Sequence, residues 1–167
     1  MIYTINNKEQ EKFLRRKASD FDFSKYNKKE IREIIKNMRA EMTTAIGLGL
    51  SANQIGLDMR LFVAKAGGKQ YAVFNPVITK FSKETILMEE GCLSVPEIFG
   101  TVERPEKITL EGYDTSGKKI KIKAWGLLAR VFQHETDHLN GILFIDKAKS
   151  LRKYENGCEN TKKDRNL

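Results

Sequence analysis

Hydrophobic residues recur at helical spacing in two stretches of the chain. Residues 28–44 place isoleucine and methionine at intervals of three and four, and Asn27 begins the pattern of a capping box. Residues 126–139 carry leucine, valine and phenylalanine on one side and end at Asn140 and Gly141, a pair typical of a left-handed helix stop. We therefore predict a surface helix over residues 28–44 and a second helix over residues 126–139.

Short runs rich in β-branched and aromatic residues predict the strands. These runs cover residues 60–65, 71–76, 77–81, 84–90, 107–114 and 119–125. In the last run lysine alternates with isoleucine, which indicates a strand with one face in water. Residues 47–58 hold three glycines and no period, so we expect a loop there. The predicted fold class is α+β, with a central helix packed against short antiparallel or mixed β-sheets and an N-terminal helix.

Composition limits the class of protein and its compartment. With 40% hydrophobic and 31% charged residues, the 167-residue chain is predicted to form one domain over residues 1–147, followed by a polar, basic tail over residues 148–167 that frays. No apolar run has the roughly 20 residues of a membrane helix, so we expect no membrane partner. The two cysteines, Cys92 and Cys158, are too few for a disulfide framework, which favours a reducing compartment such as the cytoplasm.

Positive charge is concentrated at the two ends of the chain. The net charge is +8, with 11 basic against 6 acidic residues in residues 1–40 and 7 against 3 in residues 147–167. The stretch between them is nearly neutral, so attraction to phosphate is not expected to be the chemistry of the central motifs, and no DNA partner is expected. The basic ends are either a solvated surface or a contact for an acidic partner.

The two histidines of the sequence occur together in the segment QHETDHLNG, as His134 and His138. Four residues are about one helical turn, so both imidazoles leave the predicted helix on one face and can bind one metal ion. Glu135 lies beside that face, where a carboxylate can take a proton from a metal-activated water. The alternative is a pair of helical histidines without an ion. A catalytic site would need a third protein ligand and one open position.

Candidates for the third ligand separate the classes of metalloenzyme. Phe144 stands where the metzincin pattern has its third histidine, which excludes that class. A thermolysin-like site would need Glu155 or Glu159, which lie in a polar stretch without helical period. Cys92 is the better candidate, because it follows an apolar strand in a turn of small residues. A free cysteine can instead be a small residue of the core.

Three segments resemble the three signature motifs of peptide deformylases. GLGLSANQIG at residues 47–56 is similar to G-x-G-L-A-A-x-Q-I-G, EGCLSVP at 90–96 resembles E-G-C-L-S, and QHETDHLNG at 133–141 resembles Q-H-E-x-D-H-L-x-G. Their order and intervals also match. Ser51 replaces an alanine of the first motif, and the polar residues after residue 146 do not resemble the long C-terminal helix of many bacterial members.

The resemblance implies an activity and a metal. A catalytic domain over residues 1–147 would remove the N-formyl group from the formyl-methionine of nascent polypeptides and release formate. By resemblance the ion is Fe²⁺, held by Cys92, His134 and His138, and Zn²⁺, Ni²⁺ or Co²⁺ can substitute. The types of ligand alone would indicate zinc.

The resemblance also implies roles for the residues around the metal. Glu135 would act as general base, and the Gln54 side-chain amide and the Leu93 backbone N–H would stabilise the oxyanion. Glu90 is expected to support the site, and Arg104 either braces it or is a solvated surface residue. Positions predicted to contact the substrate or to support the pocket are Leu48, Gly49, Met88, Glu90, Leu127 and Val131.

Two other functions stay open at this point. The H-E-x-x-H motif also suits a metallopeptidase that cuts internal peptide bonds. A basic RNA-binding protein with a structural metal site is the non-enzymatic alternative. A role in translation would give the basic ends a partner at the ribosome surface, in ribosomal RNA. We expect a bacterial-type cytoplasmic protein, although an organelle or a virus would also fit.

Overall fold

The structure, a computed structural model, describes residues 1–155 and 158–160 of the chain. Its helical elements are α1 (Lys8–Leu14), η1 (Phe23–Lys25), α2 (Lys28–Thr44), η2 (Ala52–Ile55), α3 (Gly126–Leu139) and η3 (Phe144–Asp146). Its strands are β1 (Gly49–Ser51), β2 (Leu61–Ala66), β3 (Lys69–Phe81), β4 (Thr85–Cys92), β5 (Val95–Pro105), β6 (Lys107–Tyr113), β7 (Lys119–Trp125), β8 (Ala148–Glu155) and β9 (Cys158–Asn160).

The strands form two antiparallel sheets. Sheet A has the order β1-β2-β3-β6-β7, and sheet B has the order β4-β5-β8-β9. Each strand pair described is antiparallel, so the sheets are not mixed. The α+β class predicted from the sequence is confirmed, and both predicted helices have the predicted bounds. The side chain of Asn27 caps α2 by accepting hydrogen bonds from the backbone N–H groups of Lys29 and Glu30.

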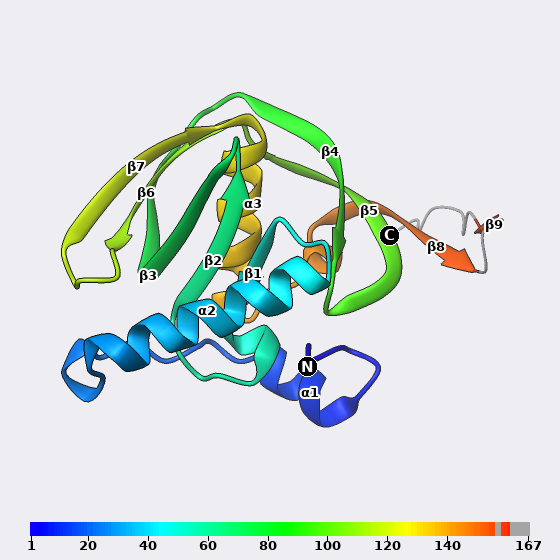
Figure 1. Cartoon of the computed structure of the whole chain (residues 1–167). Coiled ribbons are helices and arrows are strands. Elements are labelled where there is room, and N and C mark those ends of the chain that lie inside the picture. Colours follow the sequence, from blue (N-terminus) through cyan, green and yellow to red (C-terminus); the bar gives the residue numbers. More distant parts are fainter. Residues whose placement is uncertain (156–157, 161–167) are drawn as a thin grey trace.

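Sheet A is covered on both faces at β2. Phe62 and Ala64 of β2 pack in one core cluster with α3, whereas Leu61 and Val63 pack in another with α2. Two buried faces explain why β2 is continuously apolar instead of alternating. Figure 1 shows the result: α3 stands at the centre, between sheet A and the long β4–β5 hairpin, and α2 crosses the strands. The helix that carries both histidines is therefore enclosed by the rest of the fold.

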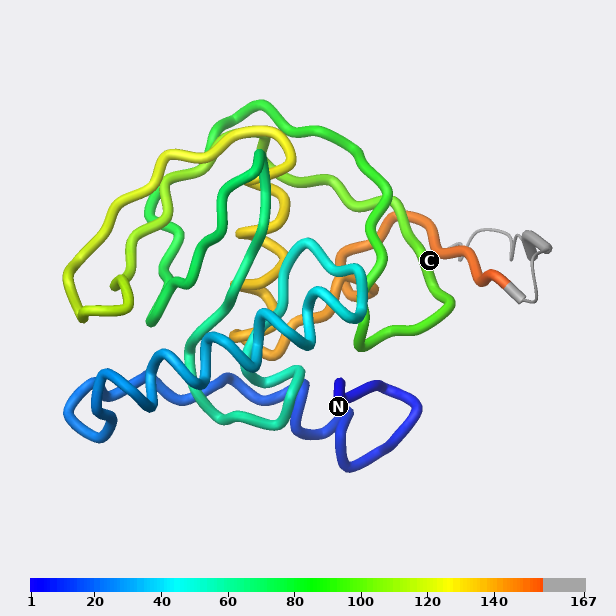
Figure 2. Tube along the Cα trace, in the orientation of Figure 1, coloured from blue at the N-terminus to red at the C-terminus, as the bar shows by residue number. Residues whose placement is uncertain are grey.

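Of the four strands of sheet B only β4 was predicted, and the sequence gives no strand signal over residues 95–105. Pro96, Gly100 and Pro105 interrupt the pattern there. The strand forms because it pairs with β4 along its length, and because Val102 packs with Phe144 in a third core cluster. Figure 2 follows the chain through this hairpin and then along the orange end segment beside it.

Three local predictions were wrong. Residues 47–58 are not all loop, because β1 pairs with β2 and η2 follows it. The helix α1 was missed, although Asn7 caps it. Residues beyond Asp146 do not fray as predicted, because β8 pairs with β5 from Val102 to Ile98. The side chains of Glu155, Cys158 and Glu159 lie outside the described residues, and the division at residue 147 stays a prediction.

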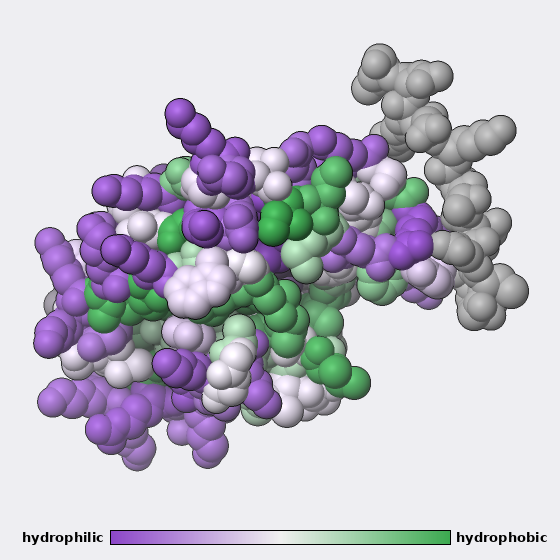
Figure 3. All heavy atoms as spheres, turned by 90° about the horizontal axis from the view of Figure 1, so that it is seen from above, coloured by the Kyte–Doolittle hydropathy of each residue, from purple (hydrophilic) through white to green (hydrophobic). Residues whose placement is uncertain are grey.

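The surface mixes hydrophilic and hydrophobic areas. Seen from above, hydrophobic side chains gather in the middle of the face with hydrophilic side chains around them (Figure 3). Large exposed apolar side chains include Ile46, Leu48 and Leu127. Among the described residues, no helix is long and apolar enough to cross a membrane.

Candidate metal centre

Three donor atoms from two parts of the chain converge. The Sγ of Cys92 lies 3.1 Å from the Nε2 of His138, which lies 3.2 Å from the Nε2 of His134. All three donor atoms lie within 4.8 Å of one another. A tetrahedral ion bound at about 2.0–2.3 Å sets its ligand atoms roughly 3.3–3.6 Å apart. The three side chains therefore fit one divalent metal ion and leave a fourth position open.

The α3 helix and the β4–β5 hairpin place these ligands. The four-residue spacing puts the imidazoles of His134 and His138 on one side of α3. Cys92 ends β4 at a point where the register with β5 shifts. The backbone N–H of Ser94 donates to the Cys92 sulfur at 3.4 Å, which fixes the direction of the thiol. The sulfur is thus held by a turn and the imidazoles by a helix.

The electrostatics of the cluster favour a bound cation. Burial raises the pKa of the Cys92 thiol, but the neighbouring imidazoles outweigh burial and hold this pKa well below its usual value. Burial lowers the pKa of His134, yet Cys92 and Glu90 raise it to about 10. The Cys92 thiolate and the Glu90 carboxylate therefore favour positive charge at this point. A divalent ion would be stabilised by the same two negative groups.

Glu90 connects His134 to two buried arginines. Its Oε2 lies 2.9 Å from the Nδ1 of His134, an arrangement that leaves Nε2 free to ligate. Its carboxylate accepts hydrogen bonds from Arg104 at 2.7 and 3.0 Å and from Arg130 at 2.8 Å. Burial opposes ionisation, but the bonds from His134 and Arg104 hold the pKa of Glu90 well below its usual range. The contact between Arg104 and Glu90 is present, and it orients the carboxylate that faces His134.

Glu135 is fully enclosed beside the ligands. Its Oε2 accepts a hydrogen bond from the Ser51 hydroxyl at 2.7 Å. A Cβ atom at Gly49 would lie 2.2 Å from its Oε1, so this glycine leaves the space that the carboxylate occupies. Burial raises the pKa of Glu135, although His134 and His138 oppose the shift. A buried carboxylate with a raised pKa next to a metal site is suited to accept a proton.

Gln54 and Leu93 both adjoin Cys92, Gln54 in space and Leu93 in sequence. The backbone N–H of Ser51 donates to Gln54 Oε1 at 2.9 Å, which turns the amide NH₂ toward Ser94 Oγ at 3.1 Å and Cys92 Sγ at 3.6 Å. Leu93 follows Cys92 in the turn between β4 and β5. Both residues line the cavity beside the ligands. The amide donor therefore faces the region predicted to hold a developing oxyanion.

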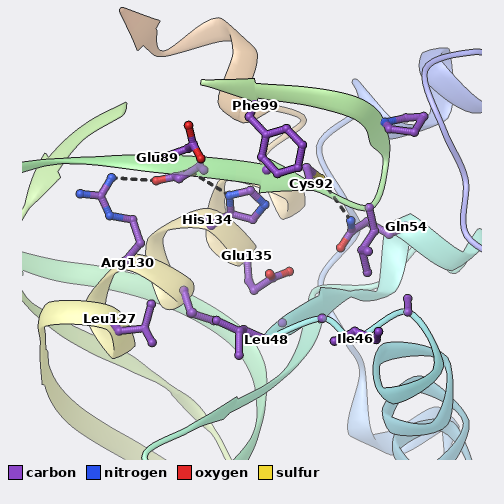
Figure 4. Close-up of a pocket in the computed structure, with 18 of the residues that line it drawn as sticks. Ile46, Leu48, Gln54, Glu89, Cys92, Phe99, Leu127, Arg130, His134 and Glu135 are labelled. Carbon is purple, nitrogen blue, oxygen red and sulfur yellow. Dashed lines mark hydrogen bonds and ion pairs between the residues drawn. The ribbon is translucent and has the colours of Figure 1, made fainter. Parts of the chain in front are cut away.

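The cavity beside the ligands has a volume of about 670 Å³. Figure 4 shows His134, Glu135, Cys92 and Gln54 around it, with Leu48 and Leu127 on the far wall. Its wall is largely apolar, as expected of a pocket for a hydrophobic side chain. The predicted positions found in this wall are Leu48, Gly49, Gln54, Glu90, Leu93, Leu127 and Val131.

Met88 is the exception among the predicted pocket residues. It does not line the cavity, and 36% of its surface is exposed. At about 3.3 Å for each residue, it lies roughly 13 Å along β4 from Cys92. The correction follows from strand geometry, because closeness in sequence to a motif does not bring an extended segment to the site.

Sequence reasoning missed several residues of the site, among them Ser51, Arg130 and Phe99. Ser51 contacts Glu135, and Arg130 contacts Glu90. Phe99, from the unpredicted strand β5, lines the cavity. For Arg130 a signal existed, because it precedes His134 by one helical turn. The contacts of Ser51 and Phe99 join segments far apart in sequence.

Known proteins are similar to this chain over most of its length. The profile of the family described as "Polypeptide deformylase" matches residues 2–154. The chain belongs to the polypeptide deformylase family. It is 42% identical over 154 residues to the peptide deformylase of Fusobacterium nucleatum, a match covering 92% of this chain and 87% of that protein. The crystal structure of peptide deformylase from Thermotoga maritima aligns with a TM-score of 0.80 at 37% identity, covering 89% of this chain and 96% of that one. A chloroplast relative from Oryza sativa, Peptide deformylase 1B, is 44% identical over 122 residues, which are 70% of this chain and 45% of that protein.

Deformylases are metal-dependent enzymes of protein biosynthesis that remove the N-formyl group from nascent polypeptides. The predicted family and activity are therefore confirmed. The metallopeptidase and the RNA-binding alternatives are no longer supported, since the H-E-x-x-H motif occurs here within a deformylase fold. The family match does not assign roles to single residues, and those roles are argued from the geometry of the site.

Proposed function

We propose that this chain releases formate from polypeptides that begin with formyl-methionine, and that Cys92, His134, His138 and Glu135 form the catalytic centre. The observation that carries the proposal is the convergence of one thiolate and two imidazoles beside a buried carboxylate, at the wall of an apolar cavity. Cleavage of an amide needs an activated water and a proton acceptor within reach of each other. These four residues supply the groups that the reaction requires.

Cys92, His134 and His138 would hold one divalent ion, Fe²⁺ by family resemblance. One thiolate and two neutral imidazoles would leave such an ion with net positive charge, and its chemistry would be to acidify a water and polarise the formyl oxygen. Glu90 keeps His134 in the ligating orientation through Nδ1. The donor set alone also suits zinc, nickel or cobalt, and the choice of iron rests on the family.

Glu135 is the proton carrier in this proposal. Its carboxylate takes a proton from the attacking water and returns it to the departing amine. The hydroxyl of Ser51 and the glycine at position 49 fix where that carboxylate stands. On the other side, the Gln54 NH₂ group and the Leu93 N–H donate to the oxygen on which charge develops. The Gln54 amide is already oriented by the hydrogen bond from Ser51, so it needs little reorganisation when the charge appears.

The apolar wall would take the methionine side chain. Leu127 and Val131 come from the first turns of α3, and Leu48 comes from the segment before β1. An unbranched thioether fits such a surface because it is flexible and polarisable. The backbone of Gly47 and Gly49 lines the same cavity, so an extended peptide can pair with it as an added strand.

Formate release from formyl-Met-Ala-Ser, by protein purified anaerobically with Fe²⁺, tests the proposal. The products are identified by mass spectrometry, so that loss of the formyl group is distinguished from cleavage of an internal peptide bond. The expected products are formate and intact Met-Ala-Ser. Cleavage between methionine and alanine without formate release would contradict the proposal.

We also propose a binding partner and a cellular compartment for this chain. The basic ends of the chain would contact ribosomal RNA at the ribosome surface, since the substrate is a nascent polypeptide. Co-sedimentation with ribosomes should fall steeply as salt rises, because phosphate contacts release counterions; binding that persists unchanged at high salt would contradict it. The cytoplasm is the compartment that we propose, and fractionation of the host cell checks it.

A further inference from the structure

The strand β8 places an aromatic side chain behind the catalytic cavity. In its pairing with β5, Arg152 stands opposite Phe99. Opposite residues share a face of a sheet, and so do alternate residues of one strand, so Tyr154 lies on that face as well. The rings of Tyr154 and Phe99 meet edge to face, with centroids 5.1 Å apart and an angle of 84°. Such a pair is an attractive arrangement of two aromatic rings.

Arg152 links the same strand to a second cavity residue. Its guanidinium lies 5.4 Å from the centroid of the Tyr154 ring and forms an ion pair with Glu89 of β4. Glu89 and Phe99 both line the cavity, whereas no residue of β8 does so among those described. The contacts of Arg152 and Tyr154 with Glu89 and Phe99 therefore connect β8 to the cavity through the β4–β5 hairpin.

The Phe99 ring occupies a defined place next to the metal ligands. It lies over Gly91, where a Cβ atom would come within 2.8 Å of its Cε1. Gly91 immediately precedes Cys92, so the ring borders the metal end of the cavity. Figure 4 shows Phe99 pointing from β5 into the site between Glu89 and Cys92. On its other side the ring meets Tyr154.

We propose that β8 is a substrate-affinity element: Tyr154, steadied by Arg152, holds the Phe99 ring as a rigid wall and thereby sets the affinity for the formyl-peptide. The inference rests on the proposed function. A wall that is ordered before binding costs no entropy when the peptide arrives, whereas a free ring must be immobilised at that moment. Tyr154 and Arg152 are positioning residues, since they act on the substrate through Phe99 and Glu89.

The test substitutes Tyr154→Ala in the full-length, metal-loaded enzyme. We expect the KM for formyl-Met-Ala-Ser and the calorimetric Kd for the product Met-Ala-Ser to rise by about 2- to 10-fold. This range corresponds to the loss of one edge-to-face aromatic pair. The kcat and the metal content should stay within twofold of the unsubstituted enzyme. Tyr154→Phe keeps the ring and should restore both constants. Arg152→Gln should raise KM in the same direction by a smaller factor.

Two substitutions on the same strand serve as matched controls. Lys149→Gln removes a charge whose partner, Glu103, does not line the cavity. Leu151→Ala shortens an apolar side chain that faces Gly100 instead of the Phe99 ring. Both controls should leave KM and Kd unchanged.

Three outcomes would overturn the proposal. They are an unchanged KM and Kd in Tyr154→Ala, an equal rise in Leu151→Ala, and a loss of kcat together with loss of metal, which would indicate a merely structural role. If the unsubstituted enzyme releases no formate, the proposed function fails instead. The calorimetric comparison of Tyr154→Ala with Tyr154→Phe still decides the role of β8 in that case.

Discussion

Gly49→Ala is expected to disable the enzyme by moving Glu135. The added Cβ would lie 2.2 Å from Oε1, 2.7 Å from Cδ and 2.8 Å from Cγ of Glu135, whereas ordinary contacts begin near 3.4 Å. The carboxylate must therefore move by more than 1 Å. It is buried and hydrogen-bonded to Ser51, so a shift of this size disturbs the bond that positions it. A displacement of about 1 Å in a catalytic group can cost roughly 100-fold in rate.

The backbone conformation at Gly49 gives no separate reason for a loss of activity. Gly49 is not among the residues with positive φ, so alanine fits its backbone conformation. We expect kcat/KM for formyl-Met-Ala-Ser to fall about 100-fold while metal content is retained, with overpacking costing about 1–3 kcal/mol of stability. Formate release, metal analysis and thermal unfolding measure the three quantities.

A double-mutant cycle tests whether Gly49 acts through Glu135. In a Glu135→Gln background the base is already lost, so adding Gly49→Ala should lower the remaining activity by little. If Gly49→Ala costs the same factor in both backgrounds, the glycine does not act through Glu135. Full activity of the single substitution would refute the clash itself.

Three other substitutions test the rest of the site. Glu135→Gln should keep the metal and lower kcat by about 100- to 10,000-fold, the usual contribution of a general base, and turnover equal to that of the unsubstituted enzyme would exclude this role. Cys92→Ala should lower the metal content measured after dialysis, whereas Cys158→Ala should not; equal retention would place the third ligand elsewhere. Arg104→Ala removes one partner from each of two buried carboxylates, Glu90 and Asp137, which keep Arg130 and Lys147, so the free energy of unfolding should fall by about 1.5–3 kcal/mol; chemical denaturation that gives an unchanged value would contradict the proposed network.

Local signals in the sequence predicted α2, α3 and the approach of the two histidines. The Asn27 cap and the apolar spacing define α2 without help from other segments, because capping and amphipathicity are local properties. His134 and His138 lie one turn apart on a single helix, so their convergence also follows from local geometry. These features were predictable because each depends on residues within one or two helical turns.

Contacts between distant segments were not predictable in this way. The strand β8 contains few apolar residues, and it forms because β5 offers an unpaired edge. Ser51 read from the sequence as a small residue in a loop, yet its hydroxyl reaches Glu135, 84 positions away. The prediction that Met88 lines the pocket was wrong, since the extended strand β4 places Met88 away from the motif that it adjoins in sequence. The long-range pairing of strands decides each of these cases.

The central claim is that Cys92, His134 and His138 hold the one metal ion on which catalysis depends. Its most direct test is a titration of metal-stripped protein with Fe²⁺ under anaerobic conditions, in which bound iron and formate release are measured on the same samples. Formate release should rise in proportion to bound iron and reach its maximum at one ion per chain. Formate release from metal-free protein, or its absence from folded protein carrying one iron, would contradict the account.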